Sequence, residues 1–276
     1  MIISVASGKG GTGKTTVATN FAGSLPQAQI LDCDVEEPNS HIFIKPEIHK
    51  QEAVYISVPE VDHGQCTHCG KCQQVCAYNA IAVLKEKTMV FAELCHGCGS
   101  CAYFCPSGAL KEQKKRIGVV EIGRSGDLQF IHGRLDIGQA MAPPLIRAVK
   151  NYINPTRVAV IDAPPGTSCP VIESIKGSDY CLLVTEPTPF GLNDLTLAVE
   201  VLRNLSIPFG VVINRSDLGD DKTEQYCEKE KIPVLLRIPF ERKIAESYSR
   251  GETIIEAFPE YKKKFQGIFK MIAEGI

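Results

Sequence analysis

Short runs of consecutive apolar residues alternate along most of the chain with longer stretches in which apolar residues recur every three or four positions. The runs predict buried strands, and the longer stretches predict amphipathic helices. Strands are expected near 2–6, 28–32, 53–58, 117–123, 127–131, 157–161, 180–185, 209–213 and 234–238. Helices are expected near 14–24, 138–152, 190–204, 221–231 and from 239 to the end. This alternation predicts an α/β fold with a mostly parallel sheet covered by helices on both faces.

Two places depart from the alternation. The Ser125-Gly126 turn joins the strands at 117–123 and 127–131 directly, which predicts a hairpin. Between residues 60 and 112 the alternation is interrupted by eight of the chain's 12 cysteines. We therefore expect a main domain formed by residues 1–59 and 113–276, with residues 60–112 inserted into it.

The eight cysteines form two runs of identical spacing, C-x2-C-x2-C-x3-C, and Pro106 follows the second run. This is the spacing by which a chain surrounds a [4Fe–4S] cluster. Zinc sites are the alternative, but a zinc ribbon usually separates two C-x2-C pairs, whereas three cysteines at successive two-residue gaps suit three corners of one cube. The candidate ligands are Cys66, Cys69, Cys72, Cys76, Cys95, Cys98, Cys101 and Cys105.

The repeat resembles the two-cluster ferredoxins, a small α+β fold in which the fourth cysteine of each run binds the other cluster. The resemblance implies that Cys105 completes the site of Cys66, Cys69 and Cys72, and that Cys76 completes the site of Cys95, Cys98 and Cys101. His68 and His96 lie inside the two runs. Since eight thiolates complete both sites, we expect these histidines to be exposed loop residues.

A phosphate-binding loop stands between the first predicted strand and the first predicted helix. The sequence GKGGTGKT satisfies the pattern G-x4-G-K-[ST]. Backbone amides of such a loop surround the phosphates, and the helix N-terminus adds a partial positive charge. Lys14 would reach the β and γ phosphates, and the Thr15 hydroxyl would hold Mg²⁺. The predicted nucleotide-binding residues of this segment are Gly8, Gly10, Gly11, Thr12, Gly13, Lys14, Thr15 and Thr16.

With Lys9, the segment KGGTGKTT resembles the deviant phosphate loop of the MinD, Mrp and nitrogenase iron protein superfamily. Asp32-Cys33-Asp34 resembles its switch I, and VIDAPPG, from Val160 to Gly166, resembles its metal-binding strand and switch II. Asn214 resembles its base-contacting asparagine. Across essentially its whole length, the chain is similar to MinD-type ATPases that carry an inserted ferredoxin domain.

The resemblance implies a homodimer that closes over two nucleotides and hydrolyses ATP slowly. Lys9 would reach the phosphates bound to the neighbouring chain, and Asp34 would position the attacking water. Asp162 would contact Mg²⁺ through a water, and the Gly166 amide would sense the γ-phosphate. Asp32 either shares the role of Asp34 or caps the loop.

Two site assignments stay open. The segment from Asn214 to Asp217, NRSD, approximates the N-K-x-D element that reads guanine. Arginine replaces the lysine and Asp217 could equally end the strand, so we favour ATP over GTP. Cys169 lies in the switch II segment, where the nitrogenase iron protein has a cysteine that holds a bridging cluster. No second such cysteine can be identified here, so Cys169 is either a bridging ligand or an ordinary switch-loop residue.

Composition and charge exclude several classes of function. A formal net charge of −2 gives no reason to expect nucleic-acid binding. No signal peptide is recognisable and no apolar run approaches the ~18 residues that span a bilayer, so a reducing cytoplasm is expected. The lysine-rich segment 261–269 is expected to be a helix packed on the sheet, not a membrane anchor. The basic segment 111–116 is expected to be a solvated face or, less simply, a dock for an acidic partner.

Two functions fit these motifs. In the first, ATP binding and hydrolysis control electron transfer from two [4Fe–4S] clusters to a partner protein. In the second, the chain is an ATPase that carries or assembles iron–sulfur clusters, as Mrp-like proteins do. Such carriers commonly have a late C-x2-C pair, and none follows residue 105. The sequence therefore favours the redox function.

Overall fold

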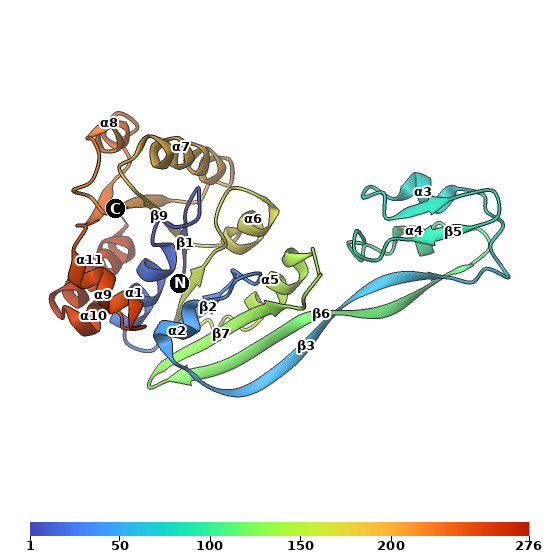
Figure 1. Cartoon of the computed structure of the whole chain (residues 1–276), viewed down its shortest axis with the longest axis horizontal. Coiled ribbons are helices and arrows are strands. Elements are labelled where there is room, and N and C mark those ends of the chain that lie inside the picture. The colour runs from blue at the N-terminus through green and yellow to red at the C-terminus, as the bar shows by residue number, and fades with distance from the viewer. Residues whose placement is uncertain (276) are drawn as a thin grey trace.

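The computed structural model describes residues 1–275, and a nine-stranded sheet forms its centre (Figure 1). The strands are β1 (Ile2–Ala6), β2 (Ala28–Asp32), β3 (Glu47–Val61), β6 (Leu110–Ser125), β7 (Leu128–Leu135), β8 (Val158–Asp162), β9 (Tyr180–Thr185), β10 (Phe209–Asn214) and β11 (Val234–Ile238). Their order is β11-β10-β9-β1-β8-β2-β7-β6-β3. All neighbours from β11 to β7 pair in parallel, whereas β6 pairs antiparallel with both β7 and β3. The predicted α/β class with a mostly parallel sheet is confirmed.

Helices cover both faces of the sheet. On one face, the sheet packs against α1 (Lys14–Ser24), α10 (Ile254–Ala257) and α11 (Glu260–Glu274). On the opposite face lie α5 (Ala142–Lys150), α6 (Cys169–Ile175), α7 (Pro189–Asn204) and α8 (Lys222–Lys229). Short α2 (Ser40–Ile44) follows β2, and α9 (Arg242–Ser249) follows β11.

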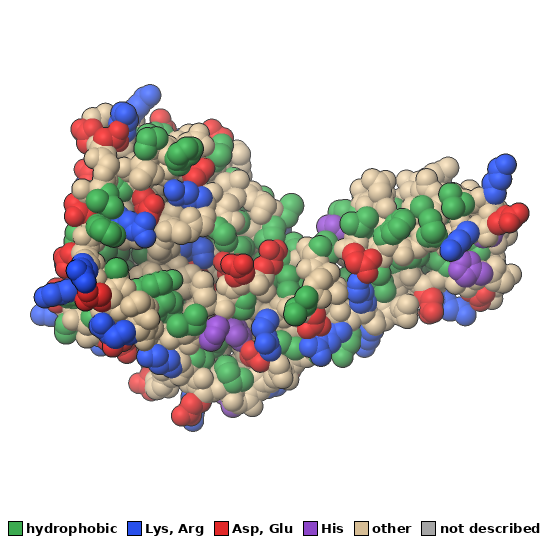
Figure 2. Space-filling model, in the orientation of Figure 1, with side chains coloured by type: hydrophobic (Ala, Val, Ile, Leu, Met, Phe, Trp, Pro, Cys, Tyr) green, Lys and Arg blue, Asp and Glu red, His purple; other side chains and the backbone are tan. Residues whose placement is uncertain are grey.

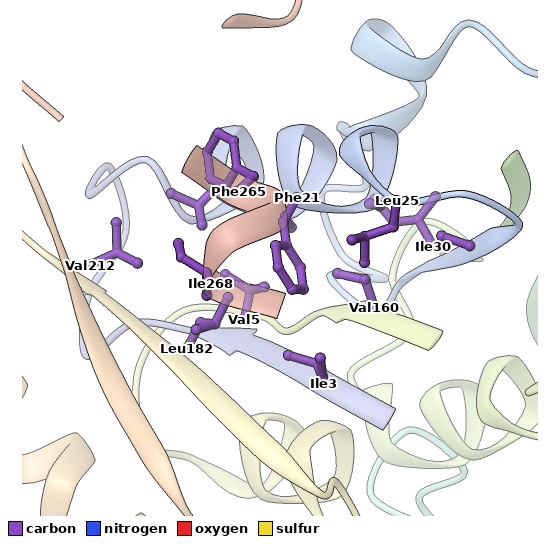
Figure 3. Close-up of a cluster of buried hydrophobic side chains, with 14 of the residues drawn as sticks. Ile3, Val5, Phe21, Leu25, Ile30, Val160, Leu182, Val212, Phe265 and Ile268 are labelled. Carbon is purple, nitrogen blue, oxygen red and sulfur yellow. The ribbon is translucent and has the colours of Figure 1, made fainter. Parts of the chain in front are cut away.

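Hydrophobic clusters form on both faces of the sheet because of the period-two geometry of its strands. Val160 packs with Phe21 of α1 and Phe265 of α11 in the cluster on one face (Figure 3), whereas its neighbour Ile161 packs in a cluster on the other face. Successive strand residues point to opposite faces, so a run of apolar residues contributes to the clusters on both faces. Phe265 and Ile268 are fully buried, which confirms that the C-terminal helix packs on the sheet. Within residues 1–275, no helix is long and apolar enough to cross a membrane.

Strands β3 and β6 are much longer than the sequence pattern predicts. They pair from Glu47–Arg124 to Val61–Leu110 and form a two-stranded ribbon that extends beyond the sheet (Figure 1). Much of the ribbon is exposed on both faces. Its side chains therefore lack the apolar–polar alternation that identifies a strand with one buried face. Residues 62–109 lie at the far end of the ribbon, and we call them the head.

The head is built as two similar halves. Its elements are α3 (Lys71–Val75), β4 (Ile81–Val83), β5 (Thr88–Val90) and α4 (Ser100–Tyr103), with β4 and β5 paired antiparallel. Each short helix follows a glycine in the left-handed region, Gly70 at φ 78° and Gly99 at φ 73°. The equivalent glycines of the two cysteine runs thus perform the same local task.

The basic segment 111–116 lies on the ribbon, where its charges have partners within the chain. Ion pairs join Lys111 to Asp62 at 3.9 Å, Lys115 to Glu93 at 3.4 Å and Arg116 to Asp136 at 2.9 Å. Figure 2 shows acidic and basic side chains side by side along this part of the molecule. This pairing supports a solvated face and gives no support to a dock for an acidic partner.

Candidate functional site

The phosphate-binding loop is held by close packing at two glycines. A Cβ on Gly8 would lie 2.1 Å from the carbonyl oxygen of Asp194, and one on Gly13 would lie 2.3 Å from Nδ2 of Asn214. Gly13 also has φ 90°, a backbone conformation that favours glycine. Gly13 directly precedes α1, so the loop ends at the N-terminus of that helix, where backbone amides and the helix dipole favour a bound phosphate.

A cavity of about 490 Å³ opens above this loop. That volume lies within the range of small-molecule sites. The predicted site residues that line it are Lys9, Gly10, Gly11, Gly13, Lys14, Thr15, Thr16, Asp34 and Asn214. Thr12 and Asp162 are buried beside it, with 2% and 0% of their surface exposed. The structure thus brings together the sequence-predicted residues of the loop, switch I and β10.

Lys14 is the cation of a buried acidic cluster. Its ammonium donates to Oδ1 of Asp162 at 2.8 Å and lies 3.9 Å from Oδ2 of Asp34. Burial alone would lower the pKa of Lys14, but the charge and hydrogen bond of Asp162, followed by Asp34, raise it above the ordinary value. The ammonium is therefore charged and ready to exchange a carboxylate for a phosphate.

Asp32 caps the loop that leads from β2 to α2. Its carboxylate accepts hydrogen bonds from the backbone amides of Asp34, Asn39 and Ser40. The Ser40 hydroxyl in turn donates to Oδ2 of Asp162 at 3.0 Å. Burial, followed by the charge of Asp162, raises the pKa of Asp32 to about 7. This geometry supports the capping role that the sequence left open.

Asp34 faces the cavity and is the less buried of the two switch I carboxylates. Burial raises its pKa to about 6, although Lys14 opposes the shift. A carboxylate with a pKa near neutrality can accept a proton from a water that it orients. The position and the raised pKa of Asp34 both suit the role that the sequence assigns to it.

Lys9 lies at the cavity with its side chain 32% exposed and its ammonium 3.9 Å from Glu186. Arg215 binds the same carboxylate at 2.9 Å.

The Gly166 amide donates to the carbonyl oxygen of Ser7 at 2.9 Å, so a γ-phosphate would have to compete with that oxygen for the amide. Sequence reasoning missed Ser40 and Glu186, although a glutamate that directly follows the buried strand β9 was a usable signal.

The opposite end of the cavity is formed by Asn214, Arg215, Phe240 and Tyr248. Asn214 donates to the carbonyl oxygen of Thr12 at 2.9 Å, which ties β10 to the phosphate-binding loop. Asp217 does not line the cavity and accepts a hydrogen bond from the Phe240 amide instead. An N-K-x-D reader needs this carboxylate free for the base, so its position favours ATP.

The head contains two further cavities, and each is lined by four cysteines. The first is lined by Cys66, Cys69, Cys72 and Cys105. The second is lined by Cys76, Cys95, Cys98 and Cys101. Each cavity thus combines three cysteines of one run with the fourth of the other, which is the grouping that the ferredoxin resemblance implies.

The donor set and backbone of these cavities fit an iron–sulfur cluster. Amides of Ala80 and Gly97 donate to the sulfurs of Cys76 and Cys95 at 3.3 and 3.4 Å. Such bonds stabilise thiolates and tune cluster potentials. Within residues 1–275, no three His, Cys, Asp or Glu side chains are grouped to hold a single metal ion. Ligands at separate corners of a cube stand farther apart than ligands of one ion.

The expectation that His68 and His96 are exposed is wrong, because both are half-buried in the cavity walls. Nδ1 of His68 lies 3.2 Å from Oγ1 of Thr88, and His96 stacks on Tyr78 with ring centroids 3.4 Å apart. The exposed Cys169 is the first residue of α6, while Cys181 and Cys227 are buried.

Comparison with known proteins agrees with the nucleotide site. The CobQ/CobB/MinD/ParA nucleotide binding domain family matches residues 3–254. An uncharacterized protein of Methanocaldococcus jannaschii is 29% identical over 93% of this chain and 92% of its own length. The iron-sulfur cluster carrier protein of Pyrococcus horikoshii is 25% identical over 98% of this chain and 87% of its own length.

Solved structures resemble the fold. The septum site-determining protein MinD of Pyrococcus horikoshii, in complex with Mg-ADP, superimposes with a TM-score of 0.57 at 19% identity. The match covers 99% of this chain and 94% of that one. The likeness therefore includes almost the whole length of both chains.

Proposed function

Because the chain belongs to the family of CobQ/CobB/MinD/ParA nucleotide-binding domains, we propose that it is a dimeric iron–sulfur ATPase whose nucleotide state controls electron transfer to a partner protein. The chain is a P-loop ATPase. One observation carries the further step: the two four-cysteine cavities lie on a ribbon that leaves the ATPase fold between Asp34 and Asp162. Slow hydrolysis and stimulation by the partner are part of the proposal.

The eight cysteines of the head would hold the redox groups. Two [4Fe–4S] clusters bound there would supply one-electron carriers. The cysteines come from both runs in each cavity, so each run is needed for both sites. The head stands clear of the sheet at the end of the ribbon, where a partner protein has access to it (Figure 1).

Binding of ATP would rearrange the buried cluster around Lys14. The ammonium would turn from Asp162 toward the phosphates, and Thr15 would hold Mg²⁺. Asp162 would then be free to contact the ion through a water. Since Ser40 is bonded to Asp162 and Asp32 caps α2, this exchange would also alter the start of α2. Release of Gly166 from Ser7 would move switch II at the same time.

Hydrolysis is proposed to need two chains. Among residues 1–275, the Lys9 ammonium is held only by a 3.9 Å ion pair to Glu186, and a third of the Lys9 side chain is exposed. Such a pair contributes little stability. The side chain can therefore turn to the phosphates of a second chain, where it would act like an arginine finger. Asp34 would orient the attacking water in its own chain.

Cluster delivery is the second candidate function. Four relatives at 24–26% identity are iron-sulfur cluster carrier proteins, and the one from Pyrococcus horikoshii shares 25% identity. The two functions predict different fates for iron. A carrier transfers its iron to the acceptor, whereas a redox protein keeps all of it and passes electrons.

The test uses reduced, ⁵⁷Fe-labelled protein prepared without oxygen. It is mixed with an oxidised ferredoxin and, separately, with a cluster-free ferredoxin, each in the presence of ADP or ATP. We expect electron transfer at a rate that depends on the nucleotide, with the label retained. Lys14→Ala is the control, since it should remove the nucleotide dependence. Transfer of the label to the cluster-free ferredoxin, without nucleotide-dependent electron transfer, would establish the carrier function instead.

A further inference from the structure

Lys150, the last residue of α5, ties that helix to the end of α6. Its ammonium donates to the carbonyl oxygens of Glu173 at 2.8 Å, Ser174 at 2.9 Å and Lys176 at 2.7 Å. All three donors of the ammonium are thus used. The carbonyls belong to the C-terminal end of α6, where the helix dipole also favours a cation. Arg147 adds a hydrogen bond to the Glu173 side chain at 3.0 Å.

Helix α6 is the first element after switch II. It begins at Cys169, three residues beyond Gly166, whose amide donates to the carbonyl oxygen of Ser7, the residue directly before the phosphate-binding loop. A short helix of 7 residues is stabilised mainly by its surroundings. Any displacement of switch II that moves α6 must therefore act on Lys150 and through it on α5.

The other side of α5 lies directly on the strands that become the ribbon. Gly118 of β6 is so close to the helix that a Cβ there would lie 2.9 Å from Cδ2 of Leu145. Gly133 of β7 is similar, with a Cβ position 2.8 Å from Cγ2 of Val149. Leu145 and Val149 are fully buried. The two glycines allow α5 to pack directly against the backbone of β6 and β7. Because a tightly packed interior transmits strain, a displacement of α5 would also displace these strands.

From Gly118 the same strand runs to the head. Leu110, at the head end of β6, is about 26 Å away at the usual rise per residue. The part of the head around Cys95 packs against the ribbon, because Cys95 is only 8% exposed and belongs to the same hydrophobic cluster as Ile56 of β3 and Ile117 of β6. In Figure 1, α6, α5 and the base of the ribbon lie in sequence between the sheet and the head.

We propose that α5 transmits the nucleotide state from switch II to the ribbon and the head, with Lys150 as the positioning residue that couples it to α6. The inference rests on the proposed function, because it states how ATP would act on the cysteine sites. It assigns this role to one helix and one side chain. The nucleotide site itself does not contain Lys150.

The test compares Lys150→Met with the wild-type chain, both prepared anaerobically with their iron. Methionine keeps the apolar stem and removes the three donors. Lys270→Met is the matched control, because Lys270 is a 76% exposed helical lysine remote from α5. Amide hydrogen exchange of the β6 peptides is measured with ADP and with a non-hydrolysable ATP analogue. Nucleotide affinity is measured on the same samples.

We expect the wild type and Lys270→Met to show at least a threefold difference in β6 exchange between the two nucleotides. Lys150→Met should lose this difference while its ATP affinity stays within about threefold of the wild type. Lys150→Gln, which retains two N–H donors without the charge, is the milder variant should methionine prevent folding. It should lose at least half of the difference.

Two results would overturn the inference: a full exchange difference in Lys150→Met or Lys150→Gln, or no difference in the wild type. The proposed function fails by a separate measurement, namely electron transfer that is indifferent to nucleotide. A chain could show the exchange difference, lose it with Lys150 and still transfer electrons indifferently. In that case the mechanical link would stand and the redox function would not.

Discussion

Replacement of Lys14 by methionine tests the account of the nucleotide site through stability. In the nucleotide-free protein this ammonium is the cation next to Asp162 at 2.8 Å and Asp34 at 3.9 Å. Lys14 and Asp162 are 7% and 0% exposed, so water cannot replace the lost partner. Removal of one member of a buried ion pair typically costs about 3–5 kcal/mol. We expect the free energy of unfolding to fall by that amount near pH 8.

The loss should depend on pH in a defined direction. Asp32 and Asp34 have pKa values of about 7 and about 6 in the folded chain, above the ordinary aspartate value of 3.8. Between those values the folded chain binds more protons than the unfolded chain, so stability decreases as the pH rises. Without the lysine charge, the folded chain would hold these protons to still higher pH. The variant should therefore lose less stability near pH 5.5 than near pH 8.

The assay is urea unfolding of the nucleotide-free protein, followed by circular dichroism at both pH values. Lys222→Met is the control, because its pair with Asp220 is exposed to solvent and contributes little stability. ATP binding by Lys14→Met should also weaken strongly, since the phosphates lose their lysine. A variant as stable as the wild type near pH 8, or one with the same loss at both pH values, would refute the reasoning.

Three further changes test other parts of the structure. Single replacement of Cys76 or Cys105 by serine should lower the iron content from about eight to about four atoms per chain. Mössbauer spectra should show that each variant has lost a different cluster site. Stoichiometric zinc in the wild type would contradict this prediction. Lys9→Ala should abolish ATP hydrolysis while the affinity for ATP persists. Mixing Lys9→Ala chains with Asp34→Ala chains should restore activity, because one site of each mixed dimer then has both residues. A fully active Lys9→Ala monomer would exclude action of Lys9 across a dimer. Phe265→Ala should lower the free energy of unfolding by about 3–5 kcal/mol in urea titrations, because this side chain is fully buried between α11 and the sheet.

Features encoded by local sequence are predictable from the sequence alone. The glycine pattern of the phosphate-binding loop needs only neighbouring residues, and the apolar runs from β8 to β11 identify strands because these strands are buried on both faces. The fold class followed from their alternation with helices. The C-terminal helix was recognised from the spacing of Tyr261, Phe265 and Ile268.

Features that depend on contacts between distant segments were not predictable in the same way. The ribbon was underestimated because its exposed strands carry polar residues on both faces. The bond from Ser40 to Asp162 joins residues 122 positions apart. The three bonds of Lys150 are made to backbone carbonyls, which have no signature in the sequence. His68 and His96 are half-buried because the two halves of the head pack together.

The most direct test of the central claim is a redox titration of the two proposed clusters in the nucleotide-free, ADP and non-hydrolysable ATP forms. Coupling between two sites is reciprocal, so an ATP-dependent potential requires an equal change in ATP affinity between oxidised and reduced protein. A shift of ~59 mV for one electron corresponds to a tenfold change in that affinity. We expect the potential of at least one cluster to shift by a comparable amount between the ADP and ATP forms. Identical potentials in all three forms, with ATP affinity unaffected by reduction, would contradict the claim that this ATPase controls electron transfer.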